Sequence, residues 1–200
     1  IDEVKKKNVV INKPFNSLSK NITGETHKSK INKISKYLII NKSDYLFVSA
    51  PENVAWILNI RGNDNPNSPI PNCRLIISKT KKIYLISEIH KIKKLIKEQK
   101  IKLDQLILPE DFERNLLKLK GNKFTIDDKT CSIFFENIIR SKFTISSKYD
   151  PTYLLKSIKN PTEIKNMIDA HILDGVALTK FIYWIKKINK NKISEIDAQI

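Results

Sequence analysis

Two spacings of apolar residues alternate along the chain, one typical of helices and one typical of short buried strands. Ile31, Ile34 and Leu38 recur at helical intervals up to about residue 41, and the apolar run at 45–48 is short enough for a buried strand. The alternation continues to residue 145. It predicts helices at residues 31–41, 52–58, 88–100, 111–119 and 131–139, and strands at 45–48, 74–78, 82–87, 106–108, 123–126 and 142–145.

Helices that alternate with strands favour an α/β domain, in which a mixed or mainly parallel sheet carries helices on its faces. The strands at 74–78 and 82–87 are close enough in sequence to form a hairpin through a Lys-Thr-Lys turn. Gly121 follows the helix at 111–119 and is expected to end it, because glycine adopts the left-handed conformation found after helices.

The two ends of the chain have different patterns. Residues 1–23 are polar and broken by Pro14, which predicts an extended tether, and Asp150-Pro151 marks a second break. A long helix is then expected at about 162–188, and Ser194 is a candidate N-cap for another. The long helix carries an apolar stripe that consists of Ile164, Ile168, His171, Ile172, Leu178, Ile182 and Ile185.

These breaks predict a connector at 1–23, an α/β domain at 24–149, and a linker with further helices at 150–200. The chain starts at Ile1, and its one methionine is Met167, so we expect residues upstream to be absent. The last helix is begun and left unfinished, which is how a truncated domain is expected to look.

The net charge of +16 raises the possibility of nucleic-acid binding. However, 33 of the 37 basic residues are lysine, in a chain rich in Ile and Asn, and this pattern favours compositional drift over a binding face. Lysine clusters at 5–7, 79–82 and 91–102 are expected to be solvated faces and loop ends. No apolar run approaches the roughly 20 residues that span a bilayer, and no secretory signal core is found, so a cytoplasmic protein without a membrane partner is expected.

Residues that could carry chemistry are scattered. Cys73 and Cys131 lie far apart without a CxxC partner and are expected to be buried free thiols. His27, His90 and His171 are separated and match no metal-binding motif. His171 falls on the apolar stripe, so a packed or hydrogen-bonded histidine is favoured over a ligand. We therefore expect no catalytic and no metal-binding residue in this chain.

The most specific motif is the run from Asn53 to Pro71, NVAWILNIRGNDNPNSPIP, in which an apolar segment stops at Arg61-Gly62 and enters a loop of Asn, Asp and Pro. This run resembles the middle domain of the aminopeptidase P (Xaa-Pro aminopeptidase) family. Further similarity to that family, in the same order, lies at Ile1–Val4, although Lys5 replaces the usual aromatic, at Gly24–Tyr37, at Leu154–Ile164 with Ala170–Leu178, and at Ile193–Ala198.

The resemblance implies a creatinase-type amino-terminal α/β fold for residues 24–149, followed by the first helices of a pita-bread peptidase domain. In the family that domain holds two divalent ions, usually manganese, through two aspartates, a histidine and two glutamates. None of those five positions falls in this chain. The resemblance therefore implies a non-catalytic portion, partnered by a missing or separately encoded peptidase domain, with dimerisation and peptide substrates belonging to the complete enzyme.

The turn that contains Asn59, Arg61, Gly62 and Asp64 is the candidate interdomain or substrate-facing loop. Gly62 is expected to permit a turn closed to other residues. Arg61 and Asp64 are expected either to pair with each other in a self-contained loop tie or to meet charges across a cleft. Trp56 is expected to be a core residue rather than a surface on which a ligand stacks.

Two other classes of function remain open from the sequence. The apolar stripe of the long helix would make the chain an interaction or oligomerisation module, from a decayed or split gene. The basic composition would make it a nucleic-acid-binding domain, with an affinity that falls steeply as salt rises.

Overall fold

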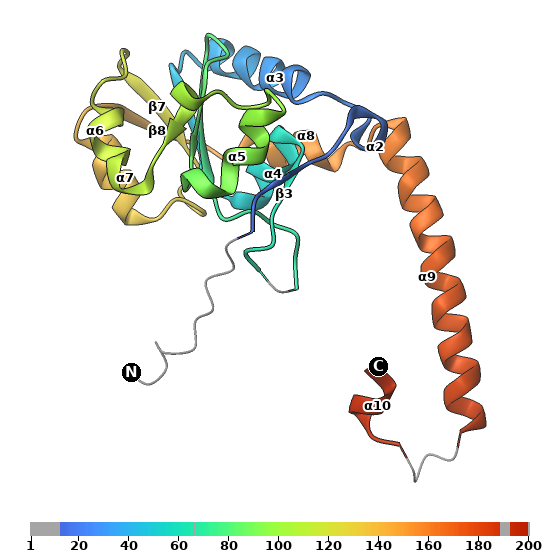
Figure 1. Cartoon of the computed structure of the whole chain (residues 1–200). Helices are drawn as coiled ribbons and strands as arrows, with labels where there is room; N and C mark the ends of the chain where they lie inside the picture. The colour runs from blue at the N-terminus through green and yellow to red at the C-terminus, as the bar shows by residue number, and fades with distance from the viewer. Residues whose placement is uncertain (1–12, 66, 189–192, 200) are drawn as a thin grey trace, which may run out of the picture. The chain divides into compact units, whose positions relative to one another are not determined.

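The computed structural model describes residues 13–65, 67–188 and 193–199 (Figure 1). These residues belong to two compact units. The first ends at Ile158, and the second begins at Lys159.

A six-stranded mixed sheet forms the centre of the first unit, with the strand order β6-β5-β4-β2-β7-β8. The central strand β2 runs antiparallel to β4 and parallel to β7, and β4 and β5 form the expected antiparallel hairpin. The prediction of a mixed sheet is confirmed. Its strands are β2 (Tyr45–Val48), β4 (Arg74–Ser78), β5 (Ile83–Ile86), β6 (Leu106–Ile107), β7 (Lys123–Ile126) and β8 (Thr144–Ser147).

Both faces of the sheet are buried under helices (Figure 1). Side chains of β2 alternate between two hydrophobic clusters: Leu46 and Val48 enter one cluster, while Tyr45 and Phe47 enter the other. The first cluster includes apolar side chains from α3 (His27–Ile40), α4 (Pro51–Leu58), α5 (Ile89–Lys97) and α8 (Pro151–Ser157). The second cluster includes side chains from α6 (Phe112–Leu116) and α7 (Ile133–Arg140). Two 3₁₀ turns, η1 (Leu103–Gln105) and η2 (Pro109–Asp111), lie on either side of β6.

The segment before α3 is packed, which corrects the prediction of an extended tether for residues 13–23. Phe15 is fully buried, and its main-chain N–H donates to the Lys91 carbonyl at 2.7 Å. Strand β1 (Asn16–Ser17) pairs with β3 (Ile60–Arg61), and α2 (Lys20–Thr23) follows. One buried aromatic and main-chain pairing hold the segment, and neither leaves a strong compositional signal. Residues 1–12, with the similarity at 1–4, lie outside the described residues.

Gly121 does not end α6, because that helix already ends at Leu116. The glycine has φ of 140° and lies at the turn into β7, where an added Cβ would come within 3.0 Å of the Asp44 carboxylate carbon. Asp44 accepts hydrogen bonds there from the main-chain N–H groups of Asn122 and Lys123. The expectation of a C-cap was wrong, and a close approach to Asp44 explains the residue instead.

The second unit contains α9 (Pro161–Lys187) and α10 (Glu195–Gln199). Pro161 is the first residue of α9, and Asn160 and Glu163 form a reciprocal capping box with distances of 2.9 and 3.0 Å. The Ser194 hydroxyl accepts from the Asp197 N–H at 3.2 Å, as an N-cap does. No described helix is both long enough and apolar enough to span a membrane.

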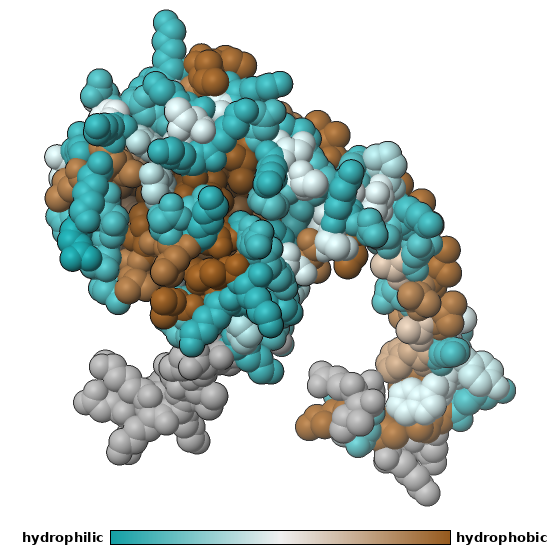
Figure 2. Space-filling view, turned by 45° about the horizontal axis from the view of Figure 1, so that its top comes forward, coloured by the Kyte–Doolittle hydropathy of each residue, from teal (hydrophilic) through white to brown (hydrophobic). Residues whose placement is uncertain are grey.

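None of the residues of α9 is buried, so the expected apolar stripe lies open along the helix (Figure 2). Ile168, Ile172 and Leu178 are each more than half exposed, at 55%, 60% and 55%. The helix was predicted correctly, and its apolar side chains have no covering layer among the described residues.

Candidate functional site

The candidate loop begins where α4 ends at Asn59. This residue adopts the left-handed conformation, with φ and ψ both at 51°, and its N–H bonds to the carbonyls of the last helical turn. Asparagine tolerates this conformation better than most residues because its short side chain can bond locally. The backbone therefore turns sharply out of α4 and into β3, which pairs with β1.

The side chain of Asn59 is used inside the domain. Its amide donates to the Thr23 hydroxyl at 3.1 Å and to the Glu25 carbonyl at 2.7 Å. Its carbonyl accepts from the Lys30 ammonium at 2.7 Å, and the residue is only 4% exposed. The main-chain carbonyl accepts from Lys100 at 2.9 Å. Asn59 thus holds the loop from within rather than facing outward.

Lys30 belongs to α3 and is 1% exposed, and its ammonium lies at the C-terminal end of α4. Its ammonium also donates to the Trp56 carbonyl at 2.9 Å and lies 3.9 Å from the centre of the Trp56 ring. The carbonyl end of a helix carries partial negative charge, so it stabilises a buried cation. This role could not be predicted from the sequence, because a buried lysine between apolar positions of a helix has the same local pattern as a solvated one.

Two lysines of the 91–102 cluster are used inside the domain, which corrects the expectation of a fully solvated face: Lys91 is buried and Lys100 is half-buried. Lys91 is 7% exposed. Lys100 donates to the Asn59 carbonyl and to the Ser17 hydroxyl, and burial lowers the pKa of Lys100 to about 8. Both lysines therefore stabilise the loop and strand β1.

Gly62 is required by a close approach and not by an unusual φ. A Cβ at this position would lie 2.6 Å from the Cα of Pro71, far inside normal contact distance. The Gly62 N–H donates to the Pro69 carbonyl at 3.1 Å. Glycine is thus needed at position 62 because the main chain at Pro71 passes close to it, and not because of an unusual turn conformation.

Asp64 pairs with Lys91 and not with Arg61. The Asp64 carboxylate lies 2.7 Å from the Lys91 ammonium and accepts from the Asn72 N–H at 2.6 Å. The side chains of the pair are 10% and 9% exposed, so water screens the charges weakly. The pair ties the loop to α5 and to the start of β4, and the predicted Arg61–Asp64 tie is not formed.

Arg61 is half-buried and has no ion pair with any carboxylate among the described residues. Its guanidinium donates to its neighbouring Ile60 carbonyl at 2.9 Å, and burial lowers the pKa of the Arg61 side chain. An arginine stays charged even so. Of the four predicted loop residues, Arg61 is therefore the one with donors to spare.

Arg61 borders a cavity of about 290 Å³ beside α4. The residues that line this cavity include the apolar side chains of Trp56, Pro69 and Ile70 and the charged side chains of Glu52 and Lys156. Trp56, predicted to be a core residue, is partly buried: it packs against the first hydrophobic cluster and also lines the cavity, and its indole N–H is buried without a partner among the described residues.

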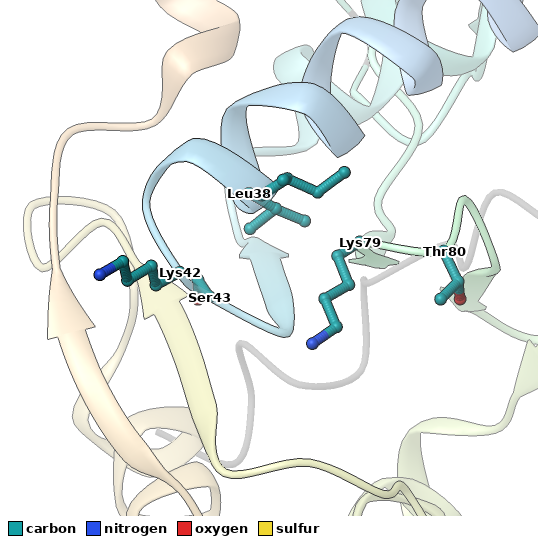
Figure 3. Close-up of a pocket in the computed structure, with 6 residues that line it drawn as sticks. Leu38, Lys42, Ser43, Lys79 and Thr80 are labelled. Carbon is teal, nitrogen blue, oxygen red and sulfur yellow. The ribbon is translucent and has the colours of Figure 1, made fainter.

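A larger cavity of about 540 Å³ lies at the end of α3 (Figure 3). Lys79, one of its lining residues, is paired with Asp44 at 2.7 Å, and Figure 3 shows that the Lys42 side chain extends away from the other labelled residues. The residues that line this cavity are Leu38, Ile39, Lys42, Ser43, Lys79 and Thr80, which include no carboxylate, imidazole or thiol.

The residue types that bind metals do not come together in the described part of the chain, where no group of three or more His, Cys, Asp or Glu could hold an ion. His171 is hydrogen-bonded to the Met167 carbonyl at 2.8 Å. Cys73 is buried as expected, whereas Cys131 is half-buried, and burial raises the pKa of Cys131 to about 11. A binuclear metal centre thus does not fit the described residues.

Comparison with known proteins identifies the class. The family described as the Creatinase/Prolidase N-terminal domain matches residues 6–163. The chain therefore belongs to the creatinase/prolidase N-terminal domain family. Relatives of the chain are named Xaa-Pro aminopeptidase or aminopeptidase P, so the resemblance to aminopeptidase P is confirmed.

Xaa-Pro aminopeptidase 1 of Dictyostelium discoideum is 31% identical over 173 residues, which cover 85% of this chain and 27% of that protein. Xaa-Pro aminopeptidase ApepP of Drosophila melanogaster is 29% identical over 180 residues, or 88% of this chain and 29% of that protein. The chain spans 27% to 33% of the length of such relatives.

A solved structure supports the fold. The X-prolyl aminopeptidase of Caenorhabditis elegans, described as a cytosolic enzyme with a di-nuclear active site, matches with a TM-score of 0.75 and 22% identity. The match covers 88% of this chain and 29% of that one. The creatinase-like α/β architecture expected from the sequence is therefore confirmed.

Proposed function

We propose that these residues form a non-catalytic portion of an Xaa-Pro aminopeptidase. The observation that carries the proposal is the family match over residues 6–163, together with relatives of that name of which the chain spans about a third or less. Residues 24–149 are the creatinase-like middle domain, 1–23 the connector, and 150–200 the linker and first helices of the peptidase domain.

The metal chemistry belongs to the peptidase domain in this proposal. Two divalent ions, manganese by resemblance to the family, are held there, and the peptide substrate binds to the complete enzyme. The cytosolic description of the C. elegans relative supports a cytoplasmic location.

The role proposed for this portion is to shape access to the active site and to contribute to subunit contacts. Asn59, Gly62 and Asp64 fix the loop, and Arg61 is the side chain that it presents. Support comes from the anchoring bonds of the loop to α3, α5 and β1, which hold its backbone in one position.

A turnover assay tests the proposal. The purified chain is incubated with Mn²⁺ and the peptide Gly-Pro-Leu, and the release of free glycine is measured. No release is expected, because the five metal ligands are not in this chain. Turnover that survives a second purification and is abolished by EDTA would contradict the proposal.

A second candidate function, an interaction module, is favoured by one observation. The apolar side chains of α9 are exposed over several turns, and such a surface drives association when nothing covers it. In this reading the chain binds a second copy of itself or a separately encoded peptidase half.

A further inference from the structure

The cavity beside α4 brings together apolar side chains and a guanidinium that forms no ion pair with a described carboxylate. Arg61 borders it from the loop, while Trp56 contributes from α4 and Ile70 from the segment before β4. Its volume of about 290 Å³ is at the lower end of the size of small-molecule sites. It therefore suits a ligand the size of one or two amino-acid residues.

Two further charged residues, Glu52 and Lys156, line the cavity, and each has a hydrogen-bond partner other than Arg61. Glu52 accepts a hydrogen bond from the Tyr153 hydroxyl at 3.1 Å. The Lys156 ammonium donates to the Asn53 side-chain carbonyl at 2.6 Å and lies 4.4 Å from the centre of the Tyr153 ring. Neither Glu52 nor any other described carboxylate forms an ion pair with Arg61.

The chemistry of the guanidinium defines what it would receive. Arginine presents a planar fork of N–H donors that matches the two oxygens of a carboxylate, and such charge-assisted bonds are stronger than neutral ones. One hydrogen bond, to the Ile60 carbonyl, occupies part of that fork. A carboxylate would satisfy the remaining donors in a half-buried place where charge is weakly screened.

We propose that this cavity is a carboxylate subsite, in which Arg61 receives the C-terminal carboxylate of a short peptide with an apolar last residue. A C-terminal residue carries its carboxylate and its apolar side chain on the same carbon, so Arg61 and the apolar side chains of Trp56 and Ile70 are engaged together. A Glu side chain presents its carboxylate two methylenes from the backbone and lacks this match. The choice of a peptide rests on the proposed function.

Calorimetric titration of the full chain tests the subsite. Gly-Pro-Leu with a free C-terminus is compared with Gly-Pro-Leu amide, and with an acetylated, amidated peptide that carries an internal Glu. A charge-assisted hydrogen bond contributes enough for about a tenfold change in Kd. The free acid is therefore expected to bind at least about tenfold more tightly than either amide.

Substitutions localise the effect. Arg61→Gln is expected to abolish the preference for the free acid, and Arg61→Lys, which keeps the charge and loses the fork, to reduce it. Arg114→Gln is the matched control, because Arg114 is exposed and paired with Asp111 at 3.0 Å on α6. Circular dichroism checks the fold, and Arg61→Lys decides the result if Arg61→Gln unfolds.

Several outcomes would overturn the inference. These are no saturable binding of the free acid, equal binding of the free acid and its amide, unchanged binding by both Arg61 variants, or stronger binding of the internal-Glu peptide. Failure of the proposed function is seen separately, because the titration measures binding to the chain alone while the turnover assay measures hydrolysis.

Discussion

Asn59 combines a left-handed backbone with side-chain hydrogen bonds to three parts of the domain. Its amide reaches Thr23 and Glu25, and its carbonyl receives the buried Lys30. A residue of this kind is difficult to replace, since both the conformation and the partners depend on the same side chain. The geometry of the whole loop depends on it.

Asn59→Ala is expected to lower the free energy of unfolding by about 3 kcal/mol, because it strains the backbone and leaves the buried Lys30 without one acceptor. Urea denaturation followed by circular dichroism measures the change. Asn63→Ala, at an exposed position in the same loop, is expected to change stability by less than about 0.5 kcal/mol. Equal effects of the two substitutions would contradict the structural role of Asn59.

Gly62 and Gly175 form a matched pair. Gly62→Ala places a methyl group 2.6 Å from the Pro71 Cα, and the resulting shift is expected to cost about 1–3 kcal/mol. Gly175→Ala lies on α9 with nothing within 4 Å, so it is expected to stabilise the helix by up to about 1 kcal/mol. Thermal unfolding of both variants measures whether each substitution raises or lowers the stability. A stabilising effect of Gly62→Ala would refute the close approach.

At the scale of elements, strong periodicity and local turn chemistry made much of the first unit predictable. Strands β2, β4 and β7 have the bounds that the sequence predicted for them, 45–48, 74–78 and 123–126. Packing made by single residues could not be predicted. Phe15 lies in a polar segment and Lys30 and Lys91 are charged, so the local composition did not indicate that partners distant in sequence bury them.

The candidate loop shows the same division. The run ending in Arg61-Gly62 located the loop, because its change from apolar to Asn- and Pro-rich residues is visible in sequence. The roles of the residues within the loop could not be predicted: Asp64 forms an ion pair with Lys91 on α5, 27 positions away, and Gly62 lies close to the main chain at Pro71. Such choices depend on how the elements pack, which no local spacing encodes.

Asp44 precedes β2 and is hydrogen-bonded to the turn before β7, and its ionisation makes the folding stability depend on pH. Burial opposes ionisation of Asp44, but hydrogen bonds from Lys79 and from the N–H groups of Asn122 and Lys123 outweigh it and hold its pKa below the ordinary value. A carboxylate with a lowered pKa in the folded state contributes stability above its unfolded pKa, which is lost as the pH falls through the folded one.

The unfolding free energy is therefore expected to decrease as the pH falls below about 4. Asp44→Asn should be less stable than the natural sequence at pH 7 and should lose less stability on acidification. Urea midpoints between pH 2 and pH 7 measure both profiles. Parallel profiles for the two proteins would show that Asp44 does not contribute.

At the scale of the whole molecule, the exposed apolar face of α9 predicts self-association. Size-exclusion chromatography with light scattering is expected to show a mass that rises with concentration. The double substitution Ile168→Lys with Ile172→Lys is expected to restore the monomer, because it places charges on the apolar stripe. Ile40→Lys, at a 79% exposed apolar position of the first unit, is the control and should not change the mass.

A clean monomer of the natural sequence at high concentration would remove the interaction-module reading. The proposal of a non-catalytic portion would remain, since it depends on the chemistry of the residues and not on the assembly of the chain.

The most direct test of that central claim is the metal content of the purified chain. After incubation with excess Mn²⁺ and gel filtration, elemental analysis is expected to find no stoichiometric manganese, because the described residues offer no group of ligands that could hold it. Two manganese ions retained per chain would contradict the account.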